Sequence, residues 1–515
     1  MPEDIRDKFT FARKSTDHRG YFRKMTVEED VITPTPNENK SSILIISEAF
    51  TTEDAINRVG FGKFQAKLII LSGFVWMAKS FHTVLENYIN SLTTCDWSLL
   101  RWHAAFMVTL TTVCTVFGCI LYGIVSDIYG RRTALTSSLI FAFVFSAVSV
   151  GLPGYIWFLV FRAIAAFSTG GFAQALTLCC EYIPGNKRGR VFFILSCFWA
   201  VGVVAMLGIL YATTRPYEYH WRLFAAVGTI PAFIAMVMMR FFPESLHFLV
   251  VSNEYDSAKN IAAELARSNC KALPRGQLHP VRNDFKRGNI CHLLSAVHAR
   301  STLLFWYMGL TTAIAFFSLD AMSPYYLGDV VDNKAINSTA SNFMGDLFKP
   351  VRCMQNVTGD EFVKILWTNA LDFPGFIVYM LLVDVIDRKK LLCASYLLTC
   401  LFIGLLFLKT EDTLMLASFI FCARTLLLGQ IDMLLLMTSE TFPTTVRGTA
   451  VGVQMSTFYL GFFLTPYISA GFLNLELEFL AGFCCVIAFI AAIASALLTW
   501  ETRGLELAMT DVFKF

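Results

Sequence analysis

The chain has 515 residues, of which 55% are hydrophobic and only 16% are charged, with a formal net charge of +3 at pH 7. A soluble protein is typically about a quarter charged, so this composition excludes an ordinary soluble protein and indicates a polytopic membrane protein. The chain also has 14 cysteines, most of them within apolar runs, where we expect them to be packing residues.

The N-terminal segment is polar and mixed in charge, and it lacks the apolar core of a signal peptide. We expect residues 1–66 to form a cytosolic tail that is disordered up to about residue 50. Within this tail, Thr51 to Val59 begins with good capping residues and predicts a short interfacial helix.

Apolar runs of about 20 residues, the length that crosses a bilayer, recur along the rest of the chain. They lie near residues 68–89, 104–125, 133–151, 155–180, 191–213 and 223–241, and again near 302–327, 362–386, 391–408, 413–438, 447–472 and 478–499. The sequence therefore predicts an all-α membrane protein with about twelve spans. We expect an N-terminal half (67–242), a cytosolic linker (243–300), a C-terminal half (301–500) and a cytosolic tail (501–515).

Basic residues gather on one side of the predicted spans, for example Arg131, Arg132, Lys187 and Lys389. The positive-inside rule places this side and both termini in the cytosol. The loop 328–361 then faces the lumen or the exterior. It contains two glycosylation acceptors, Asn337 and Asn356, whereas Asn39 fits the same pattern but lies in the cytosolic tail.

Two cysteines are predicted to lie on the outer side, Cys95 after the first span and Cys353 in the 328–361 loop. A vesicle lumen or the exterior permits oxidation, so a disulfide between them is one possibility. A bond there would tie the two halves together and restrict their opening, so two free thiols are the alternative.

A short basic link, Gly123-Ile-Val-Ser-Asp127-Ile-Tyr-Gly130-Arg131-Arg132, joins the second and third spans. Gly130 suits a tight chain reversal because a positive φ costs glycine nothing. The link resembles the signature loop of the major facilitator superfamily, G-x-x-x-D-x-x-G-R-[RK], at every defined position. A degraded copy follows at 384–390, with Asp387 in place of the glycine, and aspartate tolerates a positive φ better than most residues.

An acid and an arginine also repeat with the same spacing, as Glu181 with Arg188 and as Glu440 with Arg447. Such groups at helix ends can pair across a closed cytosolic mouth and separate when it opens, and the alternative is a set of isolated caps and topology signals. We expect a cytosolic gate made of Asp127, Gly130, Arg131, Arg132, Glu181, Arg188, Asp384, Arg388, Glu440 and Arg447.

Further segments narrow the resemblance, among them Gly60 to Gln65, Trp76 to Ala78 and Phe198 to Gly202. Over about residues 51–505 the chain resembles the group formed by the synaptic vesicle 2-related protein, synaptic vesicle glycoprotein 2 and the organic ion transporters. The resemblance implies the major facilitator fold, transport by alternating access, a vesicle membrane and a glycosylated luminal loop between spans seven and eight.

Several ionisable residues lie inside the predicted spans, where charge is costly and often functional. They are Lys79, His82, Glu86, Arg162, Asp320, Asp372, Arg424 and Asp432. In the superfamily that the chain resembles, spans one, four, seven and ten line the central cavity, which would hold all of these residues except Asp372. The alternative is that they pair with one another and only fix helix packing.

Lys79 lies near the middle of the first span and needs a partner or a hydrated cavity. We expect Asp320 or Asp432 to reach it rather than Glu86, which is two turns away. The resembled group carries an Asp and a Glu where this chain has Lys79 and His82, so its cation preference does not carry over. Without a neutralising acid, Lys79 would suit an anionic or zwitterionic solute, and His82 would change charge between cytosolic and vesicle pH.

These observations predict a transporter of a small polar or charged organic solute, with a coupling ion such as a proton as an open option. The alternative is a transporter-like receptor or scaffold that no longer transports, which the unusual first span and the degraded second loop favour. No Ser-His-Asp set, metal-ligand cluster or phosphate-binding glycine loop is visible in the sequence, so we expect no enzyme, cofactor or bound metal. We expect a monomer in a vesicle or plasma membrane and no nucleic-acid partner.

Overall fold

The computed structural model describes residues 49–213, 220–279, 287–326, 359–370, 372–407, 413–473, 477–499 and 501–509. Most of these residues are helical. The two short strands among them, β1 (Ala49–Phe50) and β2 (Gln277–Leu278), pair in parallel.

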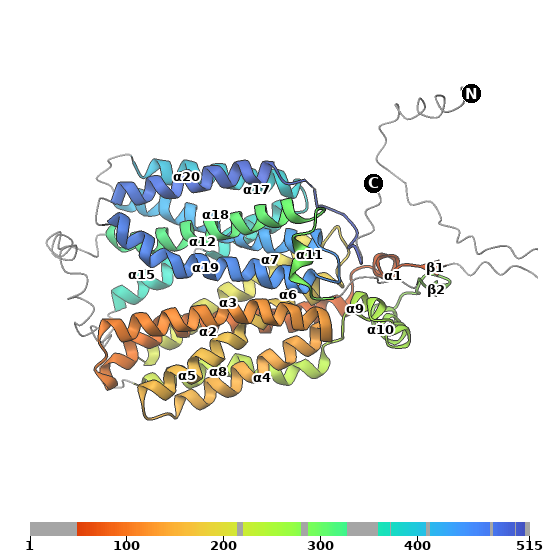
Figure 1. Ribbon diagram of the computed structural model, residues 1–515, viewed down its shortest axis with the longest axis horizontal. Helices are drawn as coiled ribbons and strands as arrows, with labels where there is room; N and C mark the ends of the chain where they lie inside the picture. Colours follow the sequence, from red (N-terminus) through yellow and green to blue (C-terminus); the bar gives the residue numbers. More distant parts are fainter. Residues whose placement is uncertain are drawn as a thin grey trace, which may run out of the picture. The chain divides into compact units, whose positions relative to one another are not determined.

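The N-terminal half, residues 63–241, is a series of long helices (Figure 1). They are α2 (Lys63–Trp97), α3 (Arg101–Tyr129), α4 (Arg131–Val150), α5 (Tyr155–Thr169), α6 (Gln174–Cys180), α7 (Arg188–Thr213) and α8 (Trp221–Met238). A 3₁₀ turn, η1 (Gly170–Ala173), joins α5 to α6, so the predicted fourth span is one helical segment with a tightened middle. A second 3₁₀ turn, η2 (Met239–Phe241), ends this half.

The C-terminal half, residues 299–496, repeats this arrangement. Its helices are α12 (Ala299–Tyr326), α15 (Gly359–Ala370), α16 (Asp372–Leu382), α17 (Arg388–Leu405), α18 (Thr413–Thr441), α19 (Arg447–Leu473) and α20 (Leu477–Ala496). The predicted eighth span corresponds to α15 and α16 together, and α15 begins inside the predicted loop 328–361.

Among the described residues, nine helical segments are long and apolar enough to cross a membrane. The segments at the other three predicted spans do not qualify. Helices α15 and α16 are short, α17 begins with three cations, and α19 has many polar residues along its length. Every predicted span nevertheless coincides with a helix. In a membrane, only a helix lets a single apolar segment satisfy its own backbone hydrogen bonds.

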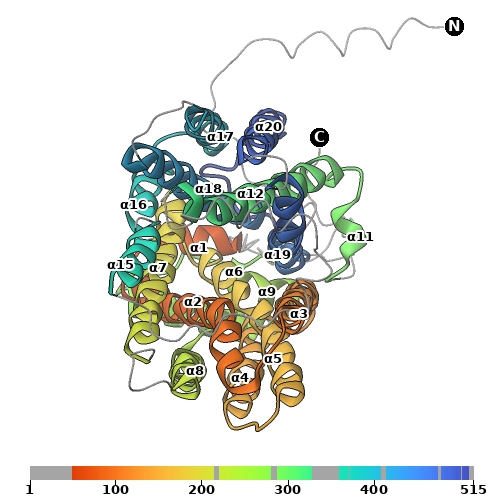
Figure 2. The same cartoon turned by 90° about the vertical axis from the view of Figure 1, so that its left-hand side faces the viewer.

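The two halves contact one another through α3 and α19, and through α7 and α16, as the view along the helices shows (Figure 2). Glycines permit the first contact. A Cβ atom on Gly123 of α3 would lie 2.7 Å from the carbonyl oxygen of Gly448 of α19, and one on Gly452 would clash with the carbonyl oxygen of Cys119. Only residues without a side chain allow backbones to approach this closely.

Shorter elements lie at one end of the long helices, which we call the charged end (Figure 1). They are α1 (Thr52–Val59), α9 (Leu246–Val251), α10 (Tyr255–Ser268), α11 (Ile290–Leu293) and the final segment 501–509. Helix α1 has a capping box, because Thr51 Oγ1 accepts from the Asp54 N–H at 3.1 Å and the Asp54 carboxylate accepts from the Thr51 N–H at 2.9 Å. The predicted helix at this position is confirmed.

Some predictions fall outside the described residues. Asn39, Asn337, Asn356 and Cys353 all lie there, and of Cys95 the structure describes only its place in α2. The glycans and the disulfide therefore remain predictions.

Candidate functional site

The link between α3 and α4 has the backbone that its sequence predicts. Gly130 has a φ of +102°, which glycine adopts without strain. Glu244 reaches this turn from the beginning of the linker, and its carboxylate accepts from the N–H groups of Arg131 at 2.9 Å and Arg132 at 3.2 Å. A carboxylate here satisfies the free N–H groups at the start of α4.

The degraded second copy does not need a glycine. Asp387 has a φ of −58°, so the tolerance of aspartate for a positive φ is not needed here. The chain enters α17 in an extended conformation, which any residue adopts. Glu501 accepts from the N–H groups of Arg388 at 2.9 Å and Lys389 at 3.1 Å, as Glu244 does at α4.

Two aspartates, one in each half, each cap a helix of the other half. Asp127 of α3 accepts from the N–H groups of Gly448 at 3.0 Å and Thr449 at 2.7 Å, in the first turn of α19. Asp384, after α16, accepts from the N–H of Arg190 at 3.1 Å, in the first turn of α7. The positive end of a helix dipole favours a carboxylate, so each contact stabilises the approach of the two halves.

The two repeated acids pair with arginines of both halves. Glu181 lies 3.3 Å from Arg131 of its own half and 2.6 Å from Arg447 of the other half. Glu440 contacts Arg388 of its own half and lies 3.4 Å from Arg188 of the other half. Each acid thus binds the arginine that belongs to the other half's copy of its motif, and these exchanged pairs connect the halves.

The exchanged pairs are withdrawn from solvent, because their side chains are at most 1% exposed. Burial by itself would raise the pKa of Glu181, but Arg131 and Arg447 outweigh burial and lower this pKa to about 2. Glu181 is therefore ionised at neutral pH. We call this set of residues the charged cluster: Asp127, Arg131, Glu181, Arg188, Asp384, Arg388, Glu440 and Arg447.

Apart from Gly130, which has no side chain, one predicted gate residue does not join the charged cluster. The Arg132 side chain is exposed, and its backbone N–H is the group that bonds to Glu244. Sequence reasoning also missed an acid that contacts the charged cluster, Glu53 of α1, whose carboxylate lies 3.4 Å from Arg188. The signal that could have found it is the amphipathic pattern of α1, which places Glu53 on the same face as the apolar Ile56 and buries it.

Inside the bundle, one arginine of each half pairs with acids of its own half. Arg162 of α5 lies 3.4 Å from Glu86 of α2. Arg424 of α18 lies 2.8 Å from Asp320 of α12 and 3.9 Å from Asp372 of α16. Asp372, which was not expected on a cavity helix, thus belongs to the second of these charge groups.

Lys79 does not pair with either of the acids that were expected to reach it. Asp320 is taken up by Arg424, and Asp432 lies against Ser196 of α7, so the expectation that either would reach Lys79 was wrong. The Lys79 ammonium lies 3.4 Å from the Thr169 carbonyl oxygen and faces two rings. Their centroids are 5.8 Å away for Trp76 and 5.1 Å away for Tyr459 of α19.

Lys79 is 1% exposed, and no carboxylate in the described part of the chain lies within ion-pair distance of it. His82, one turn further along α2, is also buried and lies edge-on to Phe172. Neither of its ring nitrogens has a hydrogen-bond partner among the described residues. The contact of Lys79 with Tyr459 places this polar pair where the two halves meet.

The fold matches that of solved sugar symporters. The proton:xylose symporter XylE bound to 6-bromo-6-deoxy-D-glucose superposes with a TM-score of 0.64 at 15% identity, over 86% of this chain and 98% of that chain. Inward-open XylE from E. coli gives a TM-score of 0.52 at 17% identity, over 86% and 97%. The architecture is the major facilitator fold, as the signature loop predicted.

The sequence identifies the family more narrowly than the fold does. Residues 67–512 match the family model described as sugar (and other) transporter, and the chain belongs to this family of major facilitator transporters. It is therefore a multi-pass membrane protein of a transporter family, and not an enzyme.

Similar curated proteins confirm the narrower resemblance. The synaptic vesicle 2-related protein of Xenopus laevis is 29% identical over 469 residues, which cover 89% of this chain and 82% of that protein. The putative transporter svop-1 of Caenorhabditis elegans is 28% identical, with coverage of 89% and 87%. The organic cation/carnitine transporter 7 of Arabidopsis thaliana is 23% identical, with coverage of 89% and 96%.

Proposed function

We propose that this chain moves a small organic solute across a membrane by alternating access, with the charged end as its cytosolic gate. The exchanged pairs, Glu181 with Arg447 and Glu440 with Arg188, carry this proposal. Each pair joins the two halves, so each can form only while the charged end is closed. In this structure both are formed.

The cost of opening such a gate is consistent with a reversible transition. Removing one partner of a buried ion pair costs about 3–5 kcal/mol, because the other charge stays buried. Opening instead releases both partners to water together, which recovers much of their hydration. In the same step Asp127 and Asp384 lose their contacts with the helix N-termini of the other half, and each contact is worth about 0.3–1 kcal/mol.

The assignment of the charged end to the cytosol is supported by its cations. Arg132 and Lys390 are exposed there, and no acid of the described chain lies within ion-pair distance of the Arg132 guanidinium. Positive loops stay on the cytosolic side of a membrane. The named relatives include a vesicle protein, so we propose a vesicle membrane, with both termini in the cytosol.

We further propose that the solute is anionic or zwitterionic. Lys79 and His82 lie between the halves, and Trp76 and Tyr459 cover the ammonium. In the described part of the chain no carboxylate lies within ion-pair distance of either residue, although Glu86 is near enough to act on Lys79 electrostatically. A solute carboxylate could pair with Lys79 while the rings hold its apolar part. One relative is named for organic cations and carnitine, and the presence of Lys79 argues that simple organic cations are poor substrates here.

The experiment is uptake into liposomes that contain the purified protein, with matched panels of organic anions, zwitterions and cations. We expect uptake of an anion or a zwitterion and little uptake of simple cations. The double substitution Lys79→Asp/His82→Glu should increase cation uptake and abolish anion uptake. Lys67→Asp is the matched control, because Lys67 is an exposed lysine of the same helix.

Two outcomes would redirect the proposal. If the wild-type protein takes up cations as well as the double variant does, Lys79 is only a structural residue. If no solute is taken up although a ligand raises the melting temperature of the protein, the chain is a transporter-like receptor. A pH gradient across the same liposomes tests proton coupling, since a coupled solute accumulates only with the gradient.

A further inference from the structure

The segment 501–509 lies over the charged cluster and contacts the gate arginines of both halves. Arg188 of the N-terminal half donates to the carbonyl oxygen of Leu505 at 3.3 Å. Arg447 of the C-terminal half donates to the carbonyl oxygen of Ala508 at 3.0 Å, and the Thr444 N–H donates to the same oxygen at 3.0 Å. The segment follows α20 and so belongs to the C-terminal half by connectivity.

Helix α1 meets this segment from the other side. The Glu53 carboxylate accepts from the Leu507 N–H at 3.1 Å and from Arg188 at 3.4 Å, and its side chain is only 5% exposed. Thr52 and Met509 lie next to each other, with 4.0 Å between Oγ1 and Sδ.

Helix α1 is in turn fixed to the N-terminal half. The Asn269 side chain bonds to the carbonyl oxygen of Gly60 at 3.3 Å and to the N–H of Phe64 at 3.0 Å, which sets the turn between α1 and α2. Only three residues, 60–62, separate the end of α1 from the start of α2, so α1 moves with the N-terminal half. A contact between α1 and residues 501–509 is therefore a contact between the two halves.

We propose that α1 and residues 501–509 form a terminal latch that holds the cytosolic gate closed, with Glu53 as a third gate acid beside Glu181 and Glu440. The latch rests on the proposed function, because it presupposes that the charged end opens. Glu53 and Glu440 share Arg188, so opening must break the bonds of Arg188 to the other half and the bond of Glu53 to Leu507 together.

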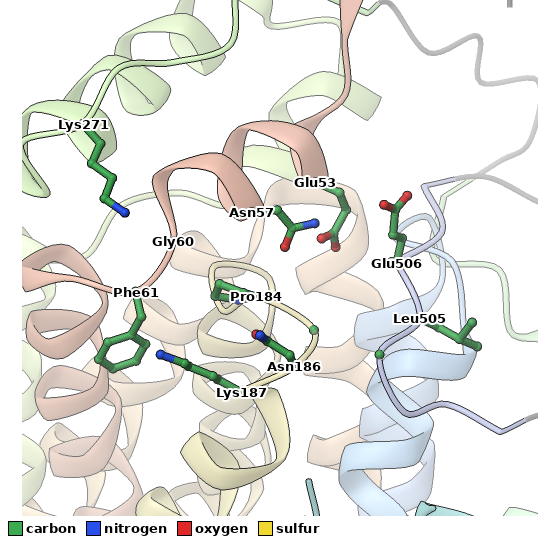
Figure 3. A pocket seen from close by; sticks show the side chains of 12 residues that line it. Glu53, Asn57, Gly60, Phe61, Pro184, Asn186, Lys187, Lys271, Leu505 and Glu506 are labelled. Carbon is green, nitrogen blue, oxygen red and sulfur yellow. The ribbon is translucent and has the colours of Figure 1, made fainter. Parts of the chain in front are cut away.

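A cavity beside the latch explains how it can release. The cavity has a volume of about 560 Å³, and Glu53, Lys187, Lys271, Leu505 and Glu506 contribute to its lining (Figure 3). Glu53 and Leu505 line this cavity, whereas the Glu181–Arg447 pair is fully buried and does not line it. A bond that water can replace breaks at lower cost, so the latch separates before the buried pairs.

The first test reads the accessibility of a thiol placed under the gate. Ser126 is fully buried and lies where α3 meets Gly448 of α19, so Ser126→Cys reports opening of the charged end. In full-length protein in liposomes, Glu53→Gln should speed maleimide labelling of this thiol about tenfold, since it weakens bonds to a charged group. The parent chain without Ser126→Cys supplies the background from native cysteines.

The control is Glu506→Gln. Glu506 lines the same cavity, but no hydrogen bond or ion pair of its side chain occurs among the described residues, and Glu53 lies close enough to repel it. This variant should label no faster than the parent. Equal labelling of Glu53→Gln and its parent would overturn the latch. If Arg447→Ala speeds labelling but Glu53→Gln does not, the latch fails and the proposed gate stands, and if neither does, both fail.

A cross-link tests the latch with Glu53 intact, should Glu53→Gln not fold. Thr52→Cys/Met509→Cys places two thiols across the latch. Oxidation should slow labelling of the Ser126→Cys thiol about tenfold in an Arg447→Ala background, and reductant should restore it. If the oxidised protein labels as fast as the reduced one, α1 and the tail stay together when the gate opens, and they are not a latch.

Discussion

Replacing Arg447 by alanine is expected to shift the protein towards a state that is open at the charged end. Arg447 donates to Glu181 at 2.6 Å, to the Phe442 carbonyl oxygen at 3.2 Å and to Thr444 Oγ1 at 3.0 Å. The last two partners move with Arg447 when the halves separate, so only the bond to Glu181 distinguishes the closed state from the open state. That difference sets the size of the effect.

A hydrogen bond to a charged group is worth about 1.5–3 kcal/mol. Since 1.4 kcal/mol is a factor of ten in an equilibrium constant, Arg447→Ala should raise the open fraction about 10- to 150-fold. The rate at which a maleimide labels the Ser126→Cys thiol measures this fraction. Lys259→Ala removes an exposed cation of α10 and is the matched control, which should leave the rate unchanged.

A double-mutant cycle with Glu181→Gln separates a gate bond from a general loss of packing. If the two side chains act on each other, the double variant opens less than the product of the two single effects predicts, with a coupling of about 0.5–3 kcal/mol. Additive effects, or unchanged labelling in both Arg447→Ala and Arg188→Ala, would refute the reasoning and leave the cluster as a set of topology signals.

Three further predictions concern other parts of the chain. Asn337→Gln/Asn356→Gln should abolish the mobility shift that glycosidase causes in the wild type, and a shift that persists would contradict the assigned orientation. The pKa of Glu181 is lowered from 4.5 to about 2, so its contribution to the closed state is complete above pH 4.5 and is lost as the pH falls towards 2. Maleimide reacts with the thiolate, so the labelling rate of the Ser126→Cys thiol is divided at each pH by that of a free thiol. This ratio should be constant from about pH 7 to 5 and rise only below about 4.5, and a rise above pH 5 would assign the pH dependence to another group. Gly123→Val should also speed labelling, because its side chain would separate α3 from α19, whereas Gly208→Val, which meets nothing within 4 Å, should not.

The sequence was sufficient for the helices and for one turn. Apolar runs of about 20 residues have few alternatives to helix in a membrane, so the spans could be located from composition alone. The positive φ of Gly130 followed from the short link in which it lies. Both inferences depend on local sequence, which determines the backbone there.

The pairing of charged residues between the two halves could not be predicted in the same way. Glu181 and Arg188 look like a pair because they are close in sequence, yet Glu181 binds Arg447 and Arg188 binds Glu440. The choice depends on how two similar halves face each other, which no local pattern contains. The same reason explains Asp372, whose helix brings it to Arg424 although it lies outside the expected cavity helices.

The partners of Lys79 could not be predicted from the sequence for a different reason. An isolated buried ammonium is costly, which favoured an acid as its partner. The structure places two aromatic rings and a carbonyl oxygen there instead, and such cation–π contacts leave no charge signature in a sequence. Glu53 was missed because α1 was interpreted as an isolated interfacial helix, without the tail that covers it.

The distance between the two halves at the charged end tests alternating access most directly. Spin labels at Arg132→Cys, in the first turn of α4, and Lys390→Cys, in the first turn of α17, lie on exposed positions of opposite halves. In liposomes, we expect the distance of the closed charged end as the main population, and a longer distance whose population grows when Glu181→Gln/Glu440→Gln removes the exchanged pairs. A single, unchanged distance distribution in the wild type and in this variant would contradict it.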